Sequence, residues 1–138
     1  MANLAAHSNQ IERNIDFLTE CDSAKCGHTT KYLEWGVVLR FYIAVHIVEA
    51  MLCELGVHSE SHSDRKMKMT RTAGVFSSKF QKDYFDLYNF SRIARYLTSN
   101  GTSVNKTDAD DAEKAVKSIR SEARAFFSDK GTLVTDRL

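Results

Sequence analysis

The fold is decided by the stretch Arg40-Phe-Tyr-Ile-Ala-Val-His46-Ile-Val-Glu-Ala-Met-Leu-Cys-Glu-Leu-Gly56. It is a long apolar pattern of helical type that carries an arginine, a histidine and two glutamates, where a core helix normally has no ionisable group. Burying such groups costs free energy unless they are paired or used. We therefore expect this helix either to line a site or to cover a partner.

The composition favours a globular protein made of long helices. A chain of 138 residues fits one domain, here taken as residues 1–138 with a core from about residue 5 to about residue 130, and can bury a real core. Its 43% hydrophobic and 27% charged residues are typical of soluble proteins. The chain has no proline, although average usage predicts roughly seven. Since proline interrupts helices, its absence favours long helices joined by short loops.

The charge and the N-terminal sequence bear on location and partners. A formal net charge of +1 gives no global attraction to nucleic acid or membranes, so any such binding depends on local clusters. The first residues lack the basic and apolar regions of a signal peptide. The apolar stretch contains Arg40, His46, Glu49 and Glu54, which are costly in lipid. We expect a cytoplasmic protein that does not interact with a membrane.

The periodicity of apolar residues predicts five helices, at about residues 5–22, 30–55, 63–72, 78–98 and from just after Thr107 onward. Gly56 is expected to end the second helix, and Ser63 and either Ser77 or Ser78 are expected to cap the third and fourth. Residues 100–103 have the composition of a loop and residues 131–138 that of a flexible tail. No segment alternates like a strand. The expected fold is all-α, an up-and-down antiparallel bundle of four long helices plus one short helix.

Metal binding is considered at two places in the sequence. Cys21-x4-Cys26-x-His28 has the spacing of half a zinc site, but no second pair of ligands matches it. His58, His62 and Asp64 form a second group, in which Asp64 and the neighbouring serines are better explained as helix caps. We expect free thiols, no metal and no cofactor.

Arg40 and His46 are the candidates for catalysis. An arginine and a histidine at this spacing could cleave RNA, with the histidine as acid or base and the arginine stabilising the developing phosphate charge. Six helical positions turn the two side chains about 120° apart and separate them by about 9 Å along the axis. A symmetric dimer could bring them together, whereas one protomer does not. The alternative is that Arg40 pairs with an acid and His46 is a hydrogen-bonded core histidine.

The basic residues form two groups. One is the run of Arg65, Lys66, Lys68 and Arg71, which is typical of a solvated helix face. The other places Arg92, Arg95 and Tyr96 within about 100° of arc on one helix. Two arginines and a tyrosine can hold a phosphate and stack on a base. They can equally bridge to acids of the apolar helix, such as Glu49.

Four short motifs occur in order along the chain: Tyr42-Ile-Ala-Val-His46-Ile-Val-Glu49-Ala, Gly56-Val-His58, Ser61-His62-x2-Arg65 and Ser91-Arg92-Ile-Ala-Arg95-Tyr96. Together they resemble the HEPN superfamily, named for higher eukaryotes and prokaryotes nucleotide-binding, and its small stand-alone bacterial and archaeal members above all. The resemblance covers about residues 30 to 127. It implies an antiparallel helical bundle that often dimerises, with a polar cleft near the dimer face. Many members are metal-independent RNases or toxins of toxin–antitoxin pairs, and others are inactive nucleotide- or RNA-binding partners in phage defence.

In the nucleolytic members, the arginine–histidine motif lies on the helix that corresponds to Ser91-Arg92-Ile-Ala-Arg95-Tyr96. No histidine follows His62 in this chain, so the motif is absent from its usual place. We therefore expect a non-catalytic module that binds a nucleotide or RNA, as a homodimer, through Tyr42, His46, His62, Arg65, Arg92, Arg95 and Tyr96. One alternative is a metal-independent RNase or toxin that uses Arg40 and His46, or His46 with Arg92. Another is a module that binds a partner protein and no ligand.

Overall fold

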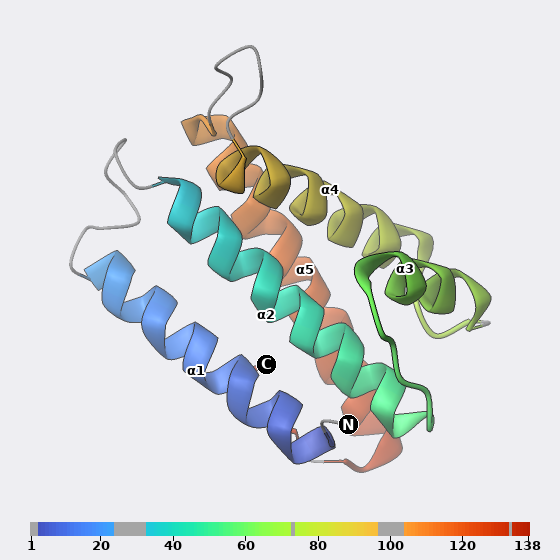
Figure 1. Cartoon of the computed structure of the whole chain (residues 1–138). Coiled ribbons are helices and arrows are strands. Elements are labelled where there is room, and N and C mark those ends of the chain that lie inside the picture. The colour runs from blue at the N-terminus through green and yellow to red at the C-terminus, as the bar shows by residue number, and fades with distance from the viewer. Residues whose placement is uncertain (1–2, 24–32, 73, 97–103, 133) are drawn as a thin grey trace.

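The computed structural model of the chain describes residues 3–23, 33–72, 74–96, 104–132 and 134–138. These residues contain helices and no strand, as predicted (Figure 1). The five helices, in chain order, are α1 (Leu4–Ser23), α2 (Leu33–Glu54), α3 (His62–Arg71), α4 (Ser78–Arg95) and α5 (Lys106–Lys130). The start predicted for the second helix, the end predicted for the fourth and the predicted loop at 100–103 include residues outside those described.

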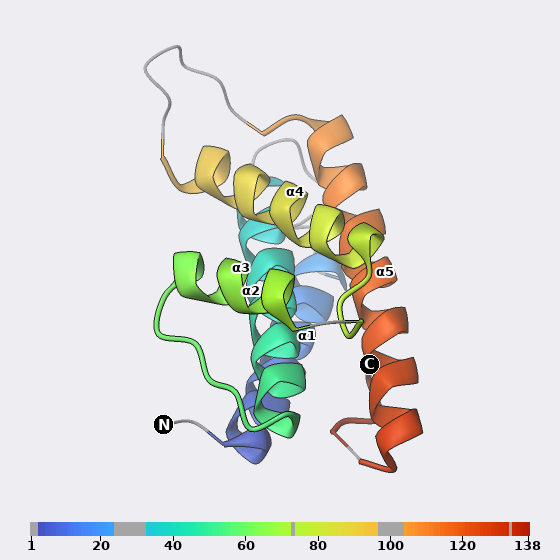
Figure 2. The same cartoon turned by 90° about the vertical axis from the view of Figure 1, so that its right-hand side faces the viewer.

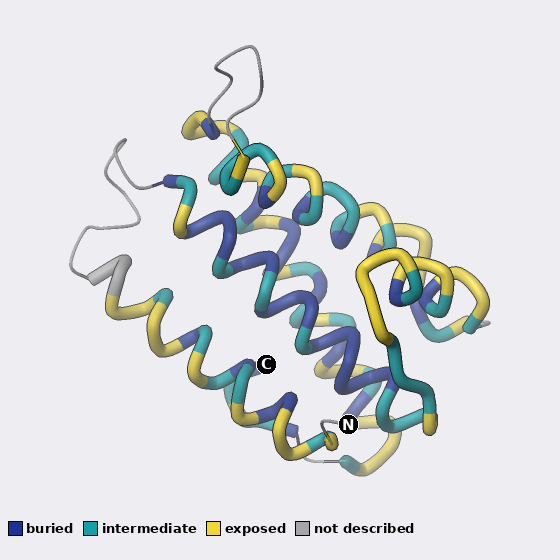
Figure 3. Tube along the Cα trace, viewed as in Figure 1, coloured by how far each residue is buried: buried dark blue, intermediate teal, exposed yellow. Residues whose placement is uncertain are grey.

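Helix α2 lies at the centre of the protein. It packs against α1, α4 and α5, and α4 also packs against α5. In Figure 1, α1 runs opposite to α2, α5 lies behind α2 in the same direction as α2, and α4 crosses them obliquely. The turned view in Figure 2 places α3 beside α4 and in front of α2. Figure 3 shows α2 buried along most of its length, while the outer turns of α1 and α4 are exposed.

The apolar character of α2 has an ordinary explanation in this packing. By length and composition alone, Leu33–Glu54 could cross a membrane, but 78% of its apolar window is buried inside the protein. The core helix of a soluble protein has the same two properties.

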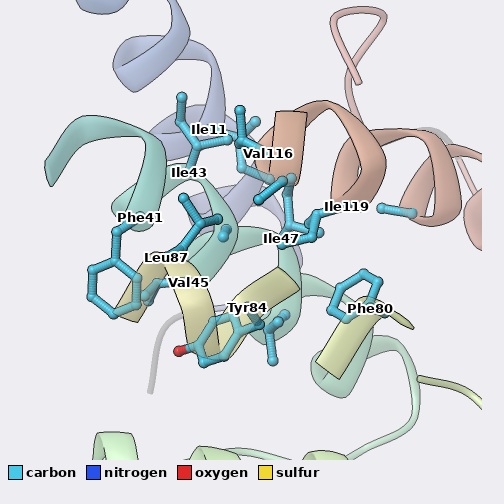
Figure 4. Close-up of a cluster of buried hydrophobic side chains, with 14 of the residues drawn as sticks. Ile11, Phe41, Ile43, Val45, Ile47, Phe80, Tyr84, Leu87, Val116 and Ile119 are labelled. Atoms are coloured by element: carbon cyan, nitrogen blue, oxygen red, sulfur yellow. The ribbon is translucent and has the colours of Figure 1, made fainter. Parts of the chain in front are cut away.

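The core takes side chains from every one of these helices, including Met69 of α3, and Figure 4 labels members from α1, α2, α4 and α5. Its largest fully buried members include Ile11, Phe41, Ile47, Phe80, Leu87 and Ile119. Burying one side chain of this size stabilises the fold by about 1.5–3 kcal/mol. Tyr84 stands at the edge of this cluster, and its hydroxyl accepts a hydrogen bond from Arg65 on α3.

The signals that end α2 and begin α3 and α4 lie close to their predicted positions. Gly56 has φ of 71° and follows the last turn of α2, where the Val57 N–H donates to the Leu52 carbonyl at 2.9 Å, which confirms its predicted role. Ser77 caps α4, as predicted. The Ser63 cap is wrong, because Ser61 accepts from the Asp64 N–H at 3.1 Å and α3 is already helical at residue 63.

Helix α5 begins at Lys106, before the predicted start after Thr107. Asn105 and Asp108 form a reciprocal capping box, in which the Asn105 side chain accepts from the Asp108 N–H at 2.9 Å and the Asp108 carboxylate accepts from the Asn105 N–H at 3.1 Å. This box fixes the start of the helix, whereas the prediction considered only the aspartates of the first turn.

Residues 134–138 differ from the predicted flexible tail. Val134 and Leu138 are only 9% and 3% exposed. The Ser8 hydroxyl of α1 donates to the Val134 carbonyl, and Thr135 donates to Glu12 at 2.8 Å. Val134 and Leu138 are therefore buried, and polar contacts hold the segment against α1.

Candidate functional site

Three polar residues of α2 lie on one side of the helix. These residues are Tyr42, His46 and Glu49. Their spacings of four and three residues place them on the same helix face. Each is bonded to a different helix. The Tyr42 hydroxyl accepts from Arg95 of α4 at 3.2 Å, the His46 Nδ1 lies 3.2 Å from the His7 Nδ1 of α1, and Glu49 pairs with Arg65 of α3. The ionisable groups on this side of the core helix are thus paired.

Glu49 and Arg65 form a buried ion pair. The Arg65 Nε lies 2.5 Å from the Glu49 Oε1, and the two side chains are only 10% and 8% exposed. The Ser59 hydroxyl donates to the same carboxylate oxygen. The Arg65 Nη1 lies 3.0 Å from the His62 Nδ1 and 3.5 Å from the Tyr84 hydroxyl. Glu49, which the sequence suggested as a possible partner of Arg92 or Arg95, is therefore paired with Arg65 instead.

His46 and His7 are held as neutral rings. Burial, followed by the nearby charges of His7 and Arg65, lowers the pKa of His46 to about 4. Burial also lowers the pKa of His7. Since both imidazoles are neutral at pH 7, one Nδ1 donates to the other across 3.2 Å. His46 fits the structural alternative, a hydrogen-bonded histidine between two helices.

Arg95 is held within the protein. Its Nε donates to the Ser91 carbonyl at 3.2 Å, its Nη2 donates to the Ser91 hydroxyl at 3.3 Å, and its Nη1 donates to Tyr42. Its guanidinium also lies 5.8 Å from the centre of the Phe41 ring. These contacts use all three nitrogens, so Arg95 positions α4 against α2.

A hollow of about 340 Å³ lies between α3 and α4 and is lined by His62, Ser63, Lys66, Tyr84, Phe85, Tyr88, Asn89 and Arg92. A second hollow of about 440 Å³ is lined by Asn89, Arg92, Ile93 and Tyr96. Because Asn89 and Arg92 border both, the two hollows are neighbours along α4, and we treat them together. We call the pair the α3–α4 groove.

The α3–α4 groove combines cations with aromatic rings. The Lys66 Nζ lies 4.6 Å from the centre of the Phe85 ring, and the Arg92 guanidinium lies 5.8 Å from the centre of the Tyr88 ring. Arg92 and Lys66 are exposed, and within the described parts of the chain neither forms an ion pair with a carboxylate. Asn89 adds an exposed amide between them. Such a surface can hold an anion that carries a flat ring system.

The structure divides the predicted site residues into two sets. His62, Arg92 and Tyr96 line the α3–α4 groove. The residues engaged in contacts behind it are Tyr42, His46, Arg65 and Arg95. Sequence reasoning missed the groove residues Lys66, Phe85, Tyr88 and Asn89, although Lys66 follows His62 by four residues and Tyr88 precedes Arg92 by four. That spacing was the available signal.

Arg40 and His46 do not share a site. Arg40 is 6% exposed, and its Nη1 folds back to 2.8 Å from the position that a Gly36 Cβ would occupy. His46 instead faces His7 on α1. The pair thus gives no combined acid–base and phosphate-stabilising geometry.

The described residues contain no group of three His, Cys, Asp or Glu side chains that could hold a metal ion. Asp64 of the second candidate group binds Lys68 at 2.7 Å. Cys53 is a half-buried free thiol, and Cys26 and His28 lie outside the described residues.

Comparisons of the chain with models of protein families, with characterised proteins and with solved structures give no match.

Proposed function

We propose that this chain is a non-catalytic nucleotide- or RNA-binding protein, and that the α3–α4 groove holds a phosphate group of its ligand. The observation that carries the proposal is that Lys66 and Arg92 lie on the two walls of one hollow and have no carboxylate partner among the described residues. A guanidinium binds two phosphate oxygens at once, and an ammonium group adds a point charge. Neither interaction needs a catalytic base.

The aromatic residues of the groove suit a base attached to that phosphate. Tyr96 is 64% exposed and borders the second hollow one turn beyond Arg92. Stacking of a base on such a ring contributes about 1–3 kcal/mol, whichever base it is. Asn89, between the two hollows, offers both a donor and an acceptor to a base edge.

We also propose an HEPN-like arrangement, namely an up-and-down bundle of four long helices plus the short α3, acting in the cytoplasm as a homodimer, in a toxin–antitoxin or phage-defence setting. The support is that residues of three of the four motifs meet in space. Glu49, His62 and Arg65 lie in one bonded cluster, and Arg92 borders the groove beside His62. A nuclease remains the alternative, but the separate environments of Arg40 and His46 do not favour it.

Binding is tested by fluorescence anisotropy with a labelled single-stranded RNA and by calorimetry with a nucleoside triphosphate. We expect Arg92→Ala and Lys66→Ala each to weaken binding by about tenfold and to reduce the slope of log K against log salt by about 1. Tyr96→Ala should weaken binding with little change in this slope. The matched control is Lys82→Ala, also on α4 but paired with Asp86 outside the groove.

Two results would remove parts of this proposal. Equal affinity of wild type, Arg92→Ala and Lys82→Ala would show that the groove is not the binding site. Cleavage of RNA by the wild type but not by His46→Ala would replace the binding function with nuclease activity. Size-exclusion chromatography with light scattering tests the dimer separately.

A further inference from the structure

Histidines are concentrated around the Glu49–Arg65 ion pair. The chain has five histidines, and four of them lie here, on α1, on α2, in the connection after α2 and on α3: His7, His46, His58 and His62. They do not converge as metal ligands, since no three candidate ligands among the described residues could hold an ion. The charge of Arg65 acts on three of them, namely His7, His46 and His62.

Helix α3 depends on Arg65 for its attachment. Only Arg65 and Met69 of this helix are buried, and the other side chains are half-buried or exposed. Arg65 reaches Glu49 on α2 and the Tyr84 hydroxyl on α4. The same helix supplies one wall of the α3–α4 groove through His62, Ser63 and Lys66. A loss of the Arg65 contacts would therefore loosen that wall.

The hydrogen bonds of the cluster require neutral histidines. A guanidinium has donors and no acceptor, so the contact of 3.0 Å between the Arg65 Nη1 and the His62 Nδ1 needs a lone pair on that nitrogen. The His7–His46 contact likewise needs one Nδ1 without a proton. Protonation would turn the first contact into a repulsion between cations and would break the second when both rings carry a charge.

We propose that this histidine cluster is an acid-responsive latch, in which protonation of His7, His46 and His62 weakens the attachment of Arg65, releases α3 and opens the α3–α4 groove. The release of α3 stands on the geometry of the cluster alone. Its effect on a ligand rests on the function proposed for the groove.

The charges around Arg65 favour such a response. The groups that face the cluster are His7 from α1, His46 and Glu49 from α2, His58 from the connection, His62 from α3, and Tyr84 and Arg95 from α4. Glu49 is the one carboxylate that pairs with Arg65 among the described residues. The nearby acid Asp64 pairs with Lys68 and accepts a hydrogen bond from the Glu60 N–H, which lies just before α3. Each proton added to these histidines therefore increases the positive charge around Arg65, while Glu49 is the carboxylate paired with it.

Hydrogen–deuterium exchange on the wild-type protein tests the latch, at about pH 7.5 and at about pH 4, where His46 is partly protonated, with rates corrected for the intrinsic effect of pH. We expect the protection of α3 amides to fall by about tenfold at the lower pH, while central amides of α5 keep theirs. Glu49→Gln should lower α3 protection already at pH 7.5. His46→Gln combined with His62→Gln should preserve protection at about pH 4 relative to the wild type.

Unchanged protection of α3 in the wild type at both pH values would overturn the latch, as would an equal loss in α3 and α5. If the double variant does not fold, the imidazole NMR signals of the wild type provide the second measurement. They should titrate over the same pH range as the loss of α3 protection, and titration of these histidines without that loss would also overturn the latch. Fluorescence anisotropy with RNA at both pH values separates the two proposals. If RNA does not bind at either pH but α3 is still released at the lower pH, the binding function is refuted and the latch is supported.

Discussion

Replacing Arg65 by methionine should cost this protein a large share of its stability. The change removes a guanidinium that lies 2.5 Å from Glu49, where both side chains are about one-tenth exposed. Removing one member of a buried ion pair leaves an uncompensated charge and typically costs 3–5 kcal/mol. The Ser59 hydroxyl still donates to Glu49 and recovers about 1 kcal/mol. We therefore expect a loss of about 3 kcal/mol, or a fall in Tm of about 10 °C.

A double-mutant cycle measures this pair directly. Glu49→Leu should cost a similar amount, whereas Glu49→Leu combined with Arg65→Met buries no charge and should cost only about 1–2 kcal/mol. The expected coupling is then at least about 3 kcal/mol, measured by urea unfolding at pH 7. The control cycle is Lys82→Met with Asp86→Leu. The side chains of Lys82 and Asp86 are 72% and 39% exposed, so we expect a coupling far smaller than that of the buried pair. Equal coupling in the two cycles would refute the buried-pair reasoning.

Three further predictions concern pH, a cap and a turn. The pKa of His46 is about 4 in the folded protein and 6.5 ordinarily, so the unfolded chain binds a proton at this residue first as the pH falls. The contribution of His46 to the free energy of unfolding is therefore fully present above about pH 6.5 and decreases as the pH drops towards 4. Because His46 is partly exposed, we expect this loss to reach about 2 kcal/mol, and urea unfolding of His46→Gln across the same range should lack it. Asn105→Ala removes the capping box and should lower stability by about 1 kcal/mol in thermal unfolding, with no measurable loss contradicting that cap. Gly56→Ala places a Cβ at φ of 71° and should cost about 1 kcal/mol, with unchanged Tm as the contrary outcome.

The helices could be predicted because their signals are local. The signals for α2 are its apolar run, the glycine that follows it and the lack of a proline that would interrupt it, and each affects only nearby residues. Helix α2 is buried along most of its length, as expected. Caps were harder, since Ser61 and Ser63 have the same chemistry and only the backbone distinguishes them. The burial of residues 134–138 depends on a surface of α1 more than a hundred residues away, which no local pattern encodes.

The candidate site was predicted only in part because it depends on how helices cross. Glu49 was considered as one possible partner of Arg92 and Arg95, but the fold places Arg65 of α3 beside it instead. Because Glu49 is paired with Arg65, Arg92 stays exposed and lines the α3–α4 groove. The same crossing makes Lys66 a wall of the groove, whereas the sequence shows it only as part of a basic run. Pairing of charges is thus set by tertiary geometry, which spacing within one helix does not reveal.

The contacts of residues 134–138 with α1 also bear on the order of folding. The bonds Ser8–Val134, Glu12–Thr135 and Asp16–Arg137 join positions 126, 123 and 121 residues apart. Closing so long a loop costs conformational entropy before any contact repays it, so such contacts form late. Residues 134–138 should therefore complete their docking on α1 last, and they should detach early when the protein begins to unfold.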